Sequence, residues 1–206
     1  MTLKSPQIDS QPPPGAIFQR LDQTAGHPYP LRDYVRRILW NLIRRTLFRW
    51  SFPRAFRWRR WLLKRFGARL GDTAFIRKGA WIWHPWLFEM GEHSTIADGV
   101  VIYNLGPVTI GNHSVLSHDT YVCAGTHDYT QCNLPLLRPP IHIGSGVWIA
   151  MQAFIGPGVT IGDNAVIGAR AVVVKDIPPD VVAAGNPARV IKPRLMRKDV
   201  TQTING

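Results

Sequence analysis

Branched aliphatic residues recur every six positions through the second half of the chain. The row consists of Ile143, Ile149, Ile155, Ile161, Ile167 and Val173. A small residue follows most of its members, namely Gly144, Ala150, Gly156, Gly162 and Gly168. This period fits neither an amphipathic helix nor an alternating strand, whose side chains repeat at about 3.6 and 2 residues. It is typical of a β-helix built from hexapeptide repeats.

Three successive hexapeptides predict one triangular coil. We expect the aliphatic side chains to point inward and stack on their copies, and the small residue to permit a sharp turn of the chain. Looser copies of the period reach back to residue 70, at Leu70, Ile76, Ile82, Met90, Ile96, Ile102, Ile110, Leu116 and Val122. The spacing slips at Phe88 and around Gly106, which predicts bulges or register breaks there. The sequence therefore predicts an all-β fold, a left-handed parallel β-helix over residues 70–192.

The six-residue period disappears between Val122 and Ile141. This stretch contains His127, and prolines are frequent in it. We therefore expect residues 124–140 to form a loop that projects from the prism.

The chain before the repeats divides into two parts. Residues 1–28 are rich in Pro, Gln and Ser, which predicts a disordered tail. Residues 29–69 form a basic segment, and over 31–66 its apolar positions predict two short helices that are interrupted at Pro53. Gly67 suits the position just after the second helix. Residues 193–206 are expected to be a C-terminal tail.

Charge is concentrated in this basic segment. The chain of 206 residues has a net charge of +12, and residues 31–69 hold thirteen Lys or Arg against one acid, Asp33. The remainder carries twelve bases and twelve acids. A basic-then-apolar signal pattern is missing at the start, and no run of about 18 apolar residues occurs. With two cysteines in no metal-binding spacing, these features predict a cytoplasmic protein.

The basic helices have two interpretations that are compatible with each other. An amphipathic helix could cover the open N-terminal end of the prism and so protect its edge. Interleaved Trp and Arg also suit the boundary of an anionic membrane, so we expect peripheral membrane contact through residues 31–66. A β-helix scaffold that binds anionic lipid or nucleic acid without catalysis is the alternative; no nucleic-acid partner is expected.

Specific strings resemble one enzyme family. YVCAGTHDY, PIHIGSGVWIA and FIGPGVTIGDNAVIGARAVVVKDIPPDVVAAGNPARVI are similar to hexapeptide-repeat O-acetyltransferases of the galactoside, maltose and nodulation-factor type. LLKRFGARLG, HPWLFEMG and VIYNLGPVTIG, after a basic Trp-rich segment, resemble the branch for colanic acid or exopolysaccharide biosynthesis. The resemblance covers residues 31–194. It implies transfer of an acetyl group from acetyl-CoA to a sugar hydroxyl, with an acceptor that could be lipid-linked, and a homotrimer with active sites between subunits.

The resemblance also implies roles for individual residues. His127 of GTHDY matches the catalytic histidine, a general base that would accept the proton of the attacking hydroxyl. His118 could support this base or serve only as a structural residue. Asn104 matches an acceptor-binding asparagine, although a turn residue is the alternative. The adjacent Asp128 is not expected to orient the imidazole, because neighbours on a strand face opposite ways.

A second group of residues would bind coenzyme A. The resemblance assigns the pantetheine arm to Trp148 and to backbone amides at Ala150 and Ala169. Lys175, Arg189 and Lys192 would lie near the phosphates, with the turn 185–188 closing the site.

A γ-type carbonic anhydrase is the rival enzyme on the same scaffold. His113 and His118 have the spacing of two of its three metal-binding histidines, but His84 and His93 do not fit the third position. We therefore expect no metal in this protein.

Overall fold

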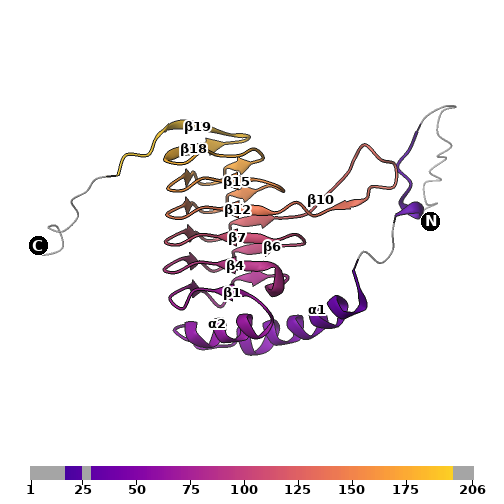
Figure 1. Cartoon of the computed structure of the whole chain (residues 1–206), viewed down its shortest axis with the longest axis horizontal. Coiled ribbons are helices and arrows are strands. Elements are labelled where there is room, and N and C mark those ends of the chain that lie inside the picture. Colours follow the sequence, from indigo (N-terminus) through magenta and orange to yellow (C-terminus); the bar gives the residue numbers. More distant parts are fainter. Residues whose placement is uncertain (1–16, 25–28, 197–206) are drawn as a thin grey trace, which may run out of the picture.

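The computed structural model describes residues 17–24 and 29–196, most of which form a three-sided prism of short parallel strands (Figure 1). Each coil of the prism contributes one strand to each of three sheets, here called A, B and C. Strands on successive coils pair in register. The left-handed parallel β-helix predicted from the six-residue period is confirmed.

The strands are short, mostly two or three residues long. Sheet A contains β1 (Arg69–Leu70), β4 (Phe88–Met90), β7 (Val108–Ile110), β12 (Ile141–Ile143) and β15 (Thr160–Ile161). Sheet B contains β2 (Phe75–Ile76), β5 (Thr95–Ile96), β8 (Val115–Leu116), β13 (Trp148–Ile149), β16 (Val166–Ile167), β18 (Val181–Gly185) and β19 (Ala188–Pro193). Sheet C contains β3 (Trp81–Ile82), β6 (Val101–Tyr103), β9 (Tyr121–Cys123), β14 (Phe154–Ile155) and β17 (Val172–Val173). The sheets are parallel except for the final pair, β18 with β19, which closes the C-terminal end.

The core is the stack of aliphatic side chains inside the prism. Ile143 pairs with Ile161, Ile149 with Ile167 and Ile155 with Val173, and all six are buried. Burying such a side chain contributes about 1.5–3 kcal/mol. The looser early coils obey the same rule, and the chain accommodates the slip before Phe88 with a short 3-10 turn, η3 (Pro85–Leu87).

The corners of the prism correct one expectation about the small residues. The left-handed backbone conformation does not fall on them but two positions later, at Gly146, Gln152, Gly158, Asn164 and Arg170. The small residue lies where the next coil approaches. A Cβ atom at Gly162 would be 2.4 Å from the backbone nitrogen of Pro179. Close packing of coil on coil, and not the turn itself, therefore requires the small side chain.

Three helical stretches cover the N-terminal end of the prism, and we call residues 31–66 the cap. They are α1 (Leu31–Ile43), the π-helical η2 (Arg44–Phe48) and α2 (Phe56–Arg65), with Pro53 in the break before α2. Helix α2 ends in a Schellman motif, because Ala68 N–H donates to Leu63 and Gly67 N–H to Lys64. None of the described helices is long and apolar enough to cross a membrane.

The inner side of the cap is joined to the first coil. Trp40 is buried, and its Nε1–H donates to the carbonyl of Ile82 at 2.7 Å. The buried Arg59 donates from Nε to the carbonyl of Ile76 at 2.6 Å, and its other nitrogens bond the chain at residues 51–53. The cap thus protects the edge that the first coil would otherwise expose.

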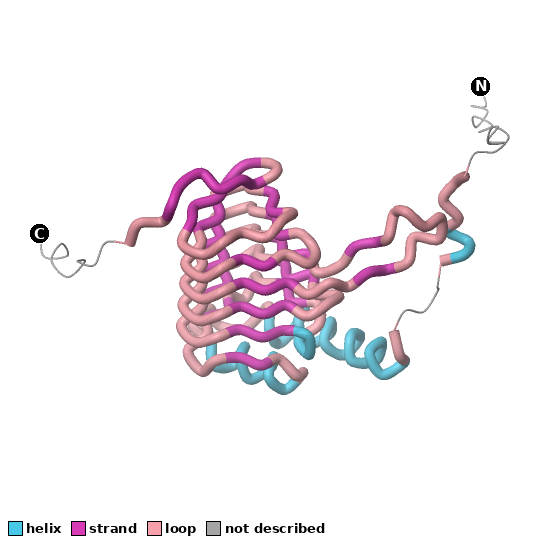
Figure 2. Tube along the Cα trace, turned by 45° about the horizontal axis from the view of Figure 1, so that its top comes forward, coloured by secondary structure: helices cyan, strands magenta, loops and turns pink. Residues whose placement is uncertain are grey.

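A hairpin leaves the prism between β9 and β12 and extends far to one side (Figures 1 and 2). Its arms pair as β10 (Thr126–His127) and β11 (Leu136–Leu137), which are antiparallel. The predicted tails fall largely on residues 1–16, 25–28 and 197–206, which lie outside the described part of the chain.

Candidate active site

His127 lies on β10 with an exposed side chain. Its Nδ1 is 2.7 Å from the carbonyl oxygen of Leu134 on the returning arm of the hairpin. A carbonyl can only accept, so Nδ1 must carry the proton and donate it. The neutral imidazole therefore presents an unprotonated Nε2, which is the form that a general base needs.

The hairpin tip fixes the position of this carbonyl. Leu134 has a φ of 44°, a conformation that L-residues rarely adopt, and its N–H donates to Gln131. Asp128 accepts hydrogen bonds from the N–H and hydroxyl of Thr130 and from Gln131. These bonds lower the pKa of the Asp128 carboxyl, and the bond from the Thr130 hydroxyl has the largest effect. Asp128 thus stabilises the turn and does not bond the imidazole. The ring is oriented instead by a main-chain oxygen, a contact that sequence patterns do not reveal.

A segment that the sequence assigns to the disordered tail packs on this hairpin. Residues 17–24 include a 3-10 turn, η1 (Leu21–Gln23). Arg20 N–H donates to the carbonyl of Cys132 at 2.6 Å, and the Thr24 hydroxyl donates to that of Asn133 at 2.9 Å. A small cleft of about 150 Å³ lies between residues 17–19 and the hairpin tip.

Asn104 is fully buried, and its side-chain amide is already engaged. The oxygen accepts the N–H of His84 at 2.9 Å, and the nitrogen donates to the His84 carbonyl at 2.7 Å. This geometry favours a structural role over direct contact with an acceptor. Asn104 stabilises the chain near the root of the hairpin, where Gly106 N–H donates to Ala124.

Trp148 begins a row of outward-facing side chains on sheet B. The register aligns Trp148 with Val166, Val166 with Val182, and Val182 with Lys192. Strand spacing gives this row a length of roughly 14 Å. The Trp148 ring is half exposed, and its Nε1–H donates to the hydroxyl of Ser117 at 3.1 Å. We call this row the sheet B strip.

The next corner of the prism carries three further predicted residues. His118, Ala150 and Ala169 follow β8, β13 and β16, so all lie in the turns between sheets B and C. The Ala150 N–H donates to the carbonyl of Ile167 at 2.9 Å. The coil ladder therefore uses this N–H, and contact between Ala150 and the pantetheine arm stays a prediction. His118 adjoins the predicted coenzyme residues and not His127, from which all of β9 separates it.

The predicted phosphate-binding bases divide into two places. Arg189 and Lys192 are exposed on β19, at the end of the sheet B strip. Lys175 is exposed after β17, at the corner between sheets C and A. The turn 185–188 connects β18 to β19 and contains a cis Asn186–Pro187 bond.

His127 and the sheet B strip lie on opposite sides of one chain. The hairpin joins β9 of sheet C to β12 of sheet A, so it leaves from the corner opposite sheet B. It then extends away from the prism (Figure 2). A single chain therefore does not bring the candidate base to its own strip.

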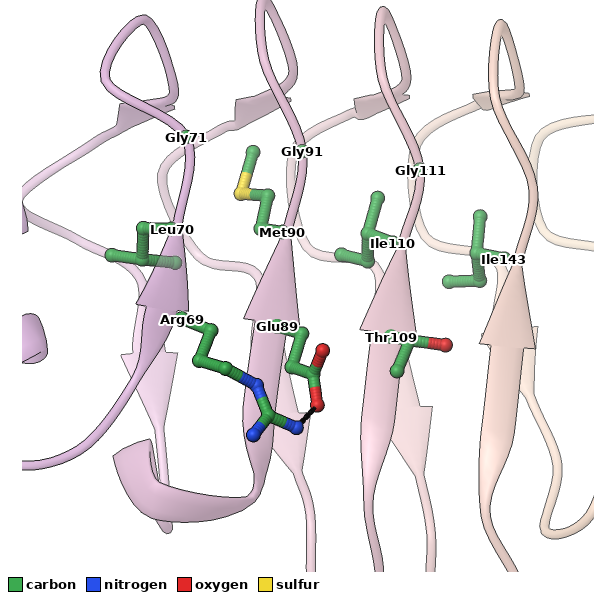
Figure 3. Close-up of a pocket in the computed structure, with 10 residues that line it drawn as sticks. All are labelled: Arg69, Leu70, Gly71, Glu89, Met90, Gly91, Thr109, Ile110, Gly111 and Ile143. Carbon is green, nitrogen blue, oxygen red and sulfur yellow. Dashed lines mark hydrogen bonds and ion pairs between the residues drawn. The ribbon is translucent and has the colours of Figure 1, made fainter.

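A separate open depression of about 500 Å³ crosses sheet A over the first four coils (Figure 3). Leu70, Met90, Ile110 and Ile143 stack along it on successive strands, and Arg69 forms an ion pair with Glu89. None of the predicted site residues lines it.

Histidine spacing alone suggested a carbonic anhydrase. The His113 ring stacks on His93 of the preceding coil with centroids 4.9 Å apart, whereas His118 lies in the following turn. In residues 17–24 and 29–196, no three His, Cys, Asp or Glu side chains are grouped so that they could hold a metal.

Comparison with known proteins connects this architecture to an enzyme family. The family model "Bacterial transferase hexapeptide (six repeats)" matches residues 140–175. WcaF of Escherichia coli K12, a predicted colanic acid biosynthesis acetyltransferase, is 43% identical over 76% of this chain and 86% of its own. A maltose O-acetyltransferase structure from Clostridium difficile 630 superposes with a TM-score of 0.74 at 28% identity, covering 81% of this chain and 90% of its own. A galactoside acetyltransferase in complex with coenzyme A gives a TM-score of 0.68 at 30% identity over 82% of this chain and 86% of its own. This chain therefore belongs to the hexapeptide-repeat acetyltransferases.

Proposed function

We propose that this chain transfers an acetyl group from acetyl-CoA to a sugar hydroxyl, with His127 as the general base. The observation that carries the assignment is the hydrogen bond from His127 Nδ1 to the Leu134 carbonyl, 2.7 Å long. It leaves Nε2 free to accept a proton, and the exposed ring on a projecting hairpin is accessible to a second molecule.

The reaction needs one proton to move twice. Nε2 of His127 accepts the proton of the acceptor hydroxyl while the oxygen attacks the thioester carbonyl. A tetrahedral intermediate forms, and its oxyanion needs hydrogen-bond donors. When the carbon–sulfur bond breaks, the imidazolium returns the proton to the leaving thiolate, and the products are an acetyl ester and free coenzyme A.

The donor is proposed to lie along the sheet B strip. Trp148 offers an exposed aromatic face for the pantetheine arm, and the Ser117 hydroxyl orients that ring. Arg189 and Lys192 supply positive charge at the far end of the strip for the phosphates. Ala169 keeps the adjoining corner open because its side chain is small. Lys175 lies at the corner between sheets C and A, the same corner as the hairpin, so it would reach only the phosphates of a coenzyme bound to the strip of a neighbouring copy.

The active site is proposed to be shared between copies in a homotrimer. One chain holds His127 and the sheet B strip on opposite sides, so a complete site needs the hairpin of one copy beside the strip of the next. Cyclic assembly repeats this contact in every interface and gives equivalent sites.

The acceptor is proposed to be a sugar unit in exopolysaccharide or related glycan biosynthesis. The names of the similar proteins support this class, since they refer to colanic acid biosynthesis, maltose and galactoside. Asn104 contributes indirectly, by fixing the chain near the root of the hairpin.

Replacing the base tests the assignment. We expect His127→Ala to lower kcat for acetyl transfer by about 10²- to 10⁴-fold, because a positioned general base contributes that much. Coenzyme A affinity, measured by calorimetry, should change little. Release of free coenzyme A in the presence of a glycan panel gives the rate. His142→Ala is the matched control, since His142 is also an exposed histidine that bonds a neighbour, Thr109. Undiminished turnover by His127→Ala would reject the proposal.

A further inference from the structure

The outer side of the cap exposes a row of large apolar side chains, and we call these residues the outer cap surface. It consists of Leu31, Val35, Ile38, Leu39, Leu42, Leu47, Trp50, Phe52, Trp58 and Trp61. Exposure is high at its centre, with Ile38 72% and Leu42 60% exposed. The aliphatic stripe of α1 is thus not buried against the first coil; Trp40 is the residue that the helix buries there.

The outer cap surface continues from α1 to α2. Leu31, Val35, Ile38 and Leu42 follow each other at helical spacing along one side of α1. At the other end, Trp58 and Trp61 of α2 stack with centroids 5.1 Å apart. Trp58 Nε1–H donates to the carbonyl of Leu47 at 3.2 Å, which ties the tryptophan pair to the end of the first helix.

The basic residues of the cap separate into an inner and an outer group. On the inner side, Arg44 lies over the Trp81 ring at 3.8 Å, and Arg60 donates to the Ala74 carbonyl at 2.8 Å. These bases bind the prism. The outer group is exposed among the apolar side chains and comprises Arg32, Arg45, Arg49, Arg54, Arg57 and Arg65.

The exposed apolar side chains and the arginines around them together favour an anionic lipid bilayer as the partner. A surface of exposed Leu, Ile and Trp rimmed by Arg matches the headgroup boundary of a bilayer, where apolar side chains enter and bases meet anionic lipid. A second copy fits poorly, because self-contact would bring the same bases together with only Asp33 as an acid in residues 31–66. Each base near an anionic surface contributes about 1 kcal/mol, so the six outer arginines form a substantial attraction.

We propose that the outer cap surface docks on an anionic lipid bilayer, with the prism standing away from it. Figure 1 shows α1 and α2 across the base of the prism, below β1. The hairpin with His127 joins β9 of the third coil to β12 of the fourth. Along sheet A, β12 lies three strand spacings, or roughly 14 Å, from β1. This geometry favours an acceptor sugar that is anchored in the same membrane, an inference that rests on the proposed function.

Flotation of the full chain with vesicles tests the docking. Vesicles of phosphatidylcholine with about a third phosphatidylglycerol should bind the protein strongly at low salt, and binding should fall as salt screens the arginines. Pure phosphatidylcholine should bind much less. We expect Ile38→Ser with Leu42→Ser to weaken partitioning by about ten- to a hundredfold, since two exposed apolar side chains would no longer enter the bilayer. Arg45→Gln with Arg49→Gln should reduce binding and its salt dependence.

Leu195→Ser with Met196→Ser is the matched control, because it removes two exposed apolar side chains that follow β19, the strand at the opposite end of the prism. Unchanged thermal unfolding verifies that each variant folds. Absence of binding to anionic vesicles, or equal binding by the Ile38 and Leu42 variant, would overturn the docking. A second copy would cover the surface if the wild type bound no lipid and the Ile38→Ser, Leu42→Ser variant had a smaller mass than the wild type by light scattering. That result would also overturn the docking. His127→Ala should bind vesicles like the wild type. Failure of the catalytic assignment can therefore be distinguished from failure of the membrane docking.

Discussion

His84 is an imidazole that the fold keeps neutral. It follows β3, is 1% exposed, and its Nδ1–H donates to the Asn104 carbonyl at 2.9 Å. Burial lowers the pKa of His84 from 6.5 to about 4; the charges of Arg37 and Arg138 also lower it, against the Asn104 hydrogen bond and Asp33. In the unfolded chain the imidazole binds a proton as the pH falls through about 6.5, whereas in the folded chain it does so only near pH 4.

This difference predicts acid sensitivity. As the pH falls from 6.5 to about 4, proton binding by unfolded His84 should remove about 3 kcal/mol from the free energy of unfolding. His84→Asn keeps a side-chain N–H for the Asn104 carbonyl and does not titrate. The melting temperature of the wild type should therefore fall more steeply over this interval than that of the variant. Parallel curves for the two proteins would show that another group causes the loss.

Residue types were predictable from sequence more readily than the bonds they make. The GTHDY string drew attention to His127, but its orientation depends on the carbonyl of Leu134, and a main-chain atom leaves no mark in the sequence. Asn104 resembled an acceptor ligand because its identity matched. Its engagement with His84 depends on the preceding coil, twenty residues earlier in the chain.

At the scale of the repeat, contact between coils restricts the residue that follows each strand of sheet A, which is a glycine at positions 71, 91, 111, 144 and 162. A Cβ at Gly162 would be 2.4 Å from the nitrogen and 2.8 Å from the Cα of Pro179, which are backbone atoms of the next coil. Gly158 differs, since its φ is 75° while the nearest atom to an added Cβ, on Pro139, is 3.4 Å away. One position is limited by space and the other by backbone conformation.

The two glycines predict two different costs. Gly158→Ala should destabilise the fold by about 1–2 kcal/mol, the cost of the left-handed conformation. Gly162→Ala should cost more, about 3 kcal/mol or beyond, because backbone must move to admit the methyl group. Urea unfolding of both variants gives the comparison. If Gly158→Ala proved the more damaging, turn conformation and not coil spacing would govern the small positions.

Elements were predictable wherever a period could be followed. The aliphatic row from Ile143 to Val173 gave the inward positions of β12 to β17, because every coil repeats one environment. The cap was only half predictable. Its pattern gave two helices and a break at Pro53, but both sides of α1 carry apolar residues. The choice of Trp40 as the buried anchor depends on the Ile82 carbonyl beneath it.

At the scale of the whole molecule, the proposed base and the proposed coenzyme-binding strip lie on opposite sides of a prism. The hairpin leaves the corner between sheets C and A, and the strip from Trp148 to Lys192 lies on sheet B. A variant that lacks the base still has an intact strip, and a strip variant still has an intact base. Two inactive proteins of these kinds could therefore complete each other's sites in a mixed trimer.

Complementation is the resulting prediction. We expect His127→Ala and Trp148→Ala with Lys192→Glu to be nearly inactive alone, and to regain activity when co-expressed with different affinity tags and purified as mixed trimers. In a cyclic trimer each interface pairs one hairpin with one strip, so a trimer with both variants contains one interface with wild-type base and wild-type strip. Activity near one third of wild type is expected. Mixing the separately assembled homotrimers without exchange is the control and should stay inactive. If mixed trimers are as inactive as their parents, base and strip act within one chain, and the hairpin would then have to fold back across its own prism.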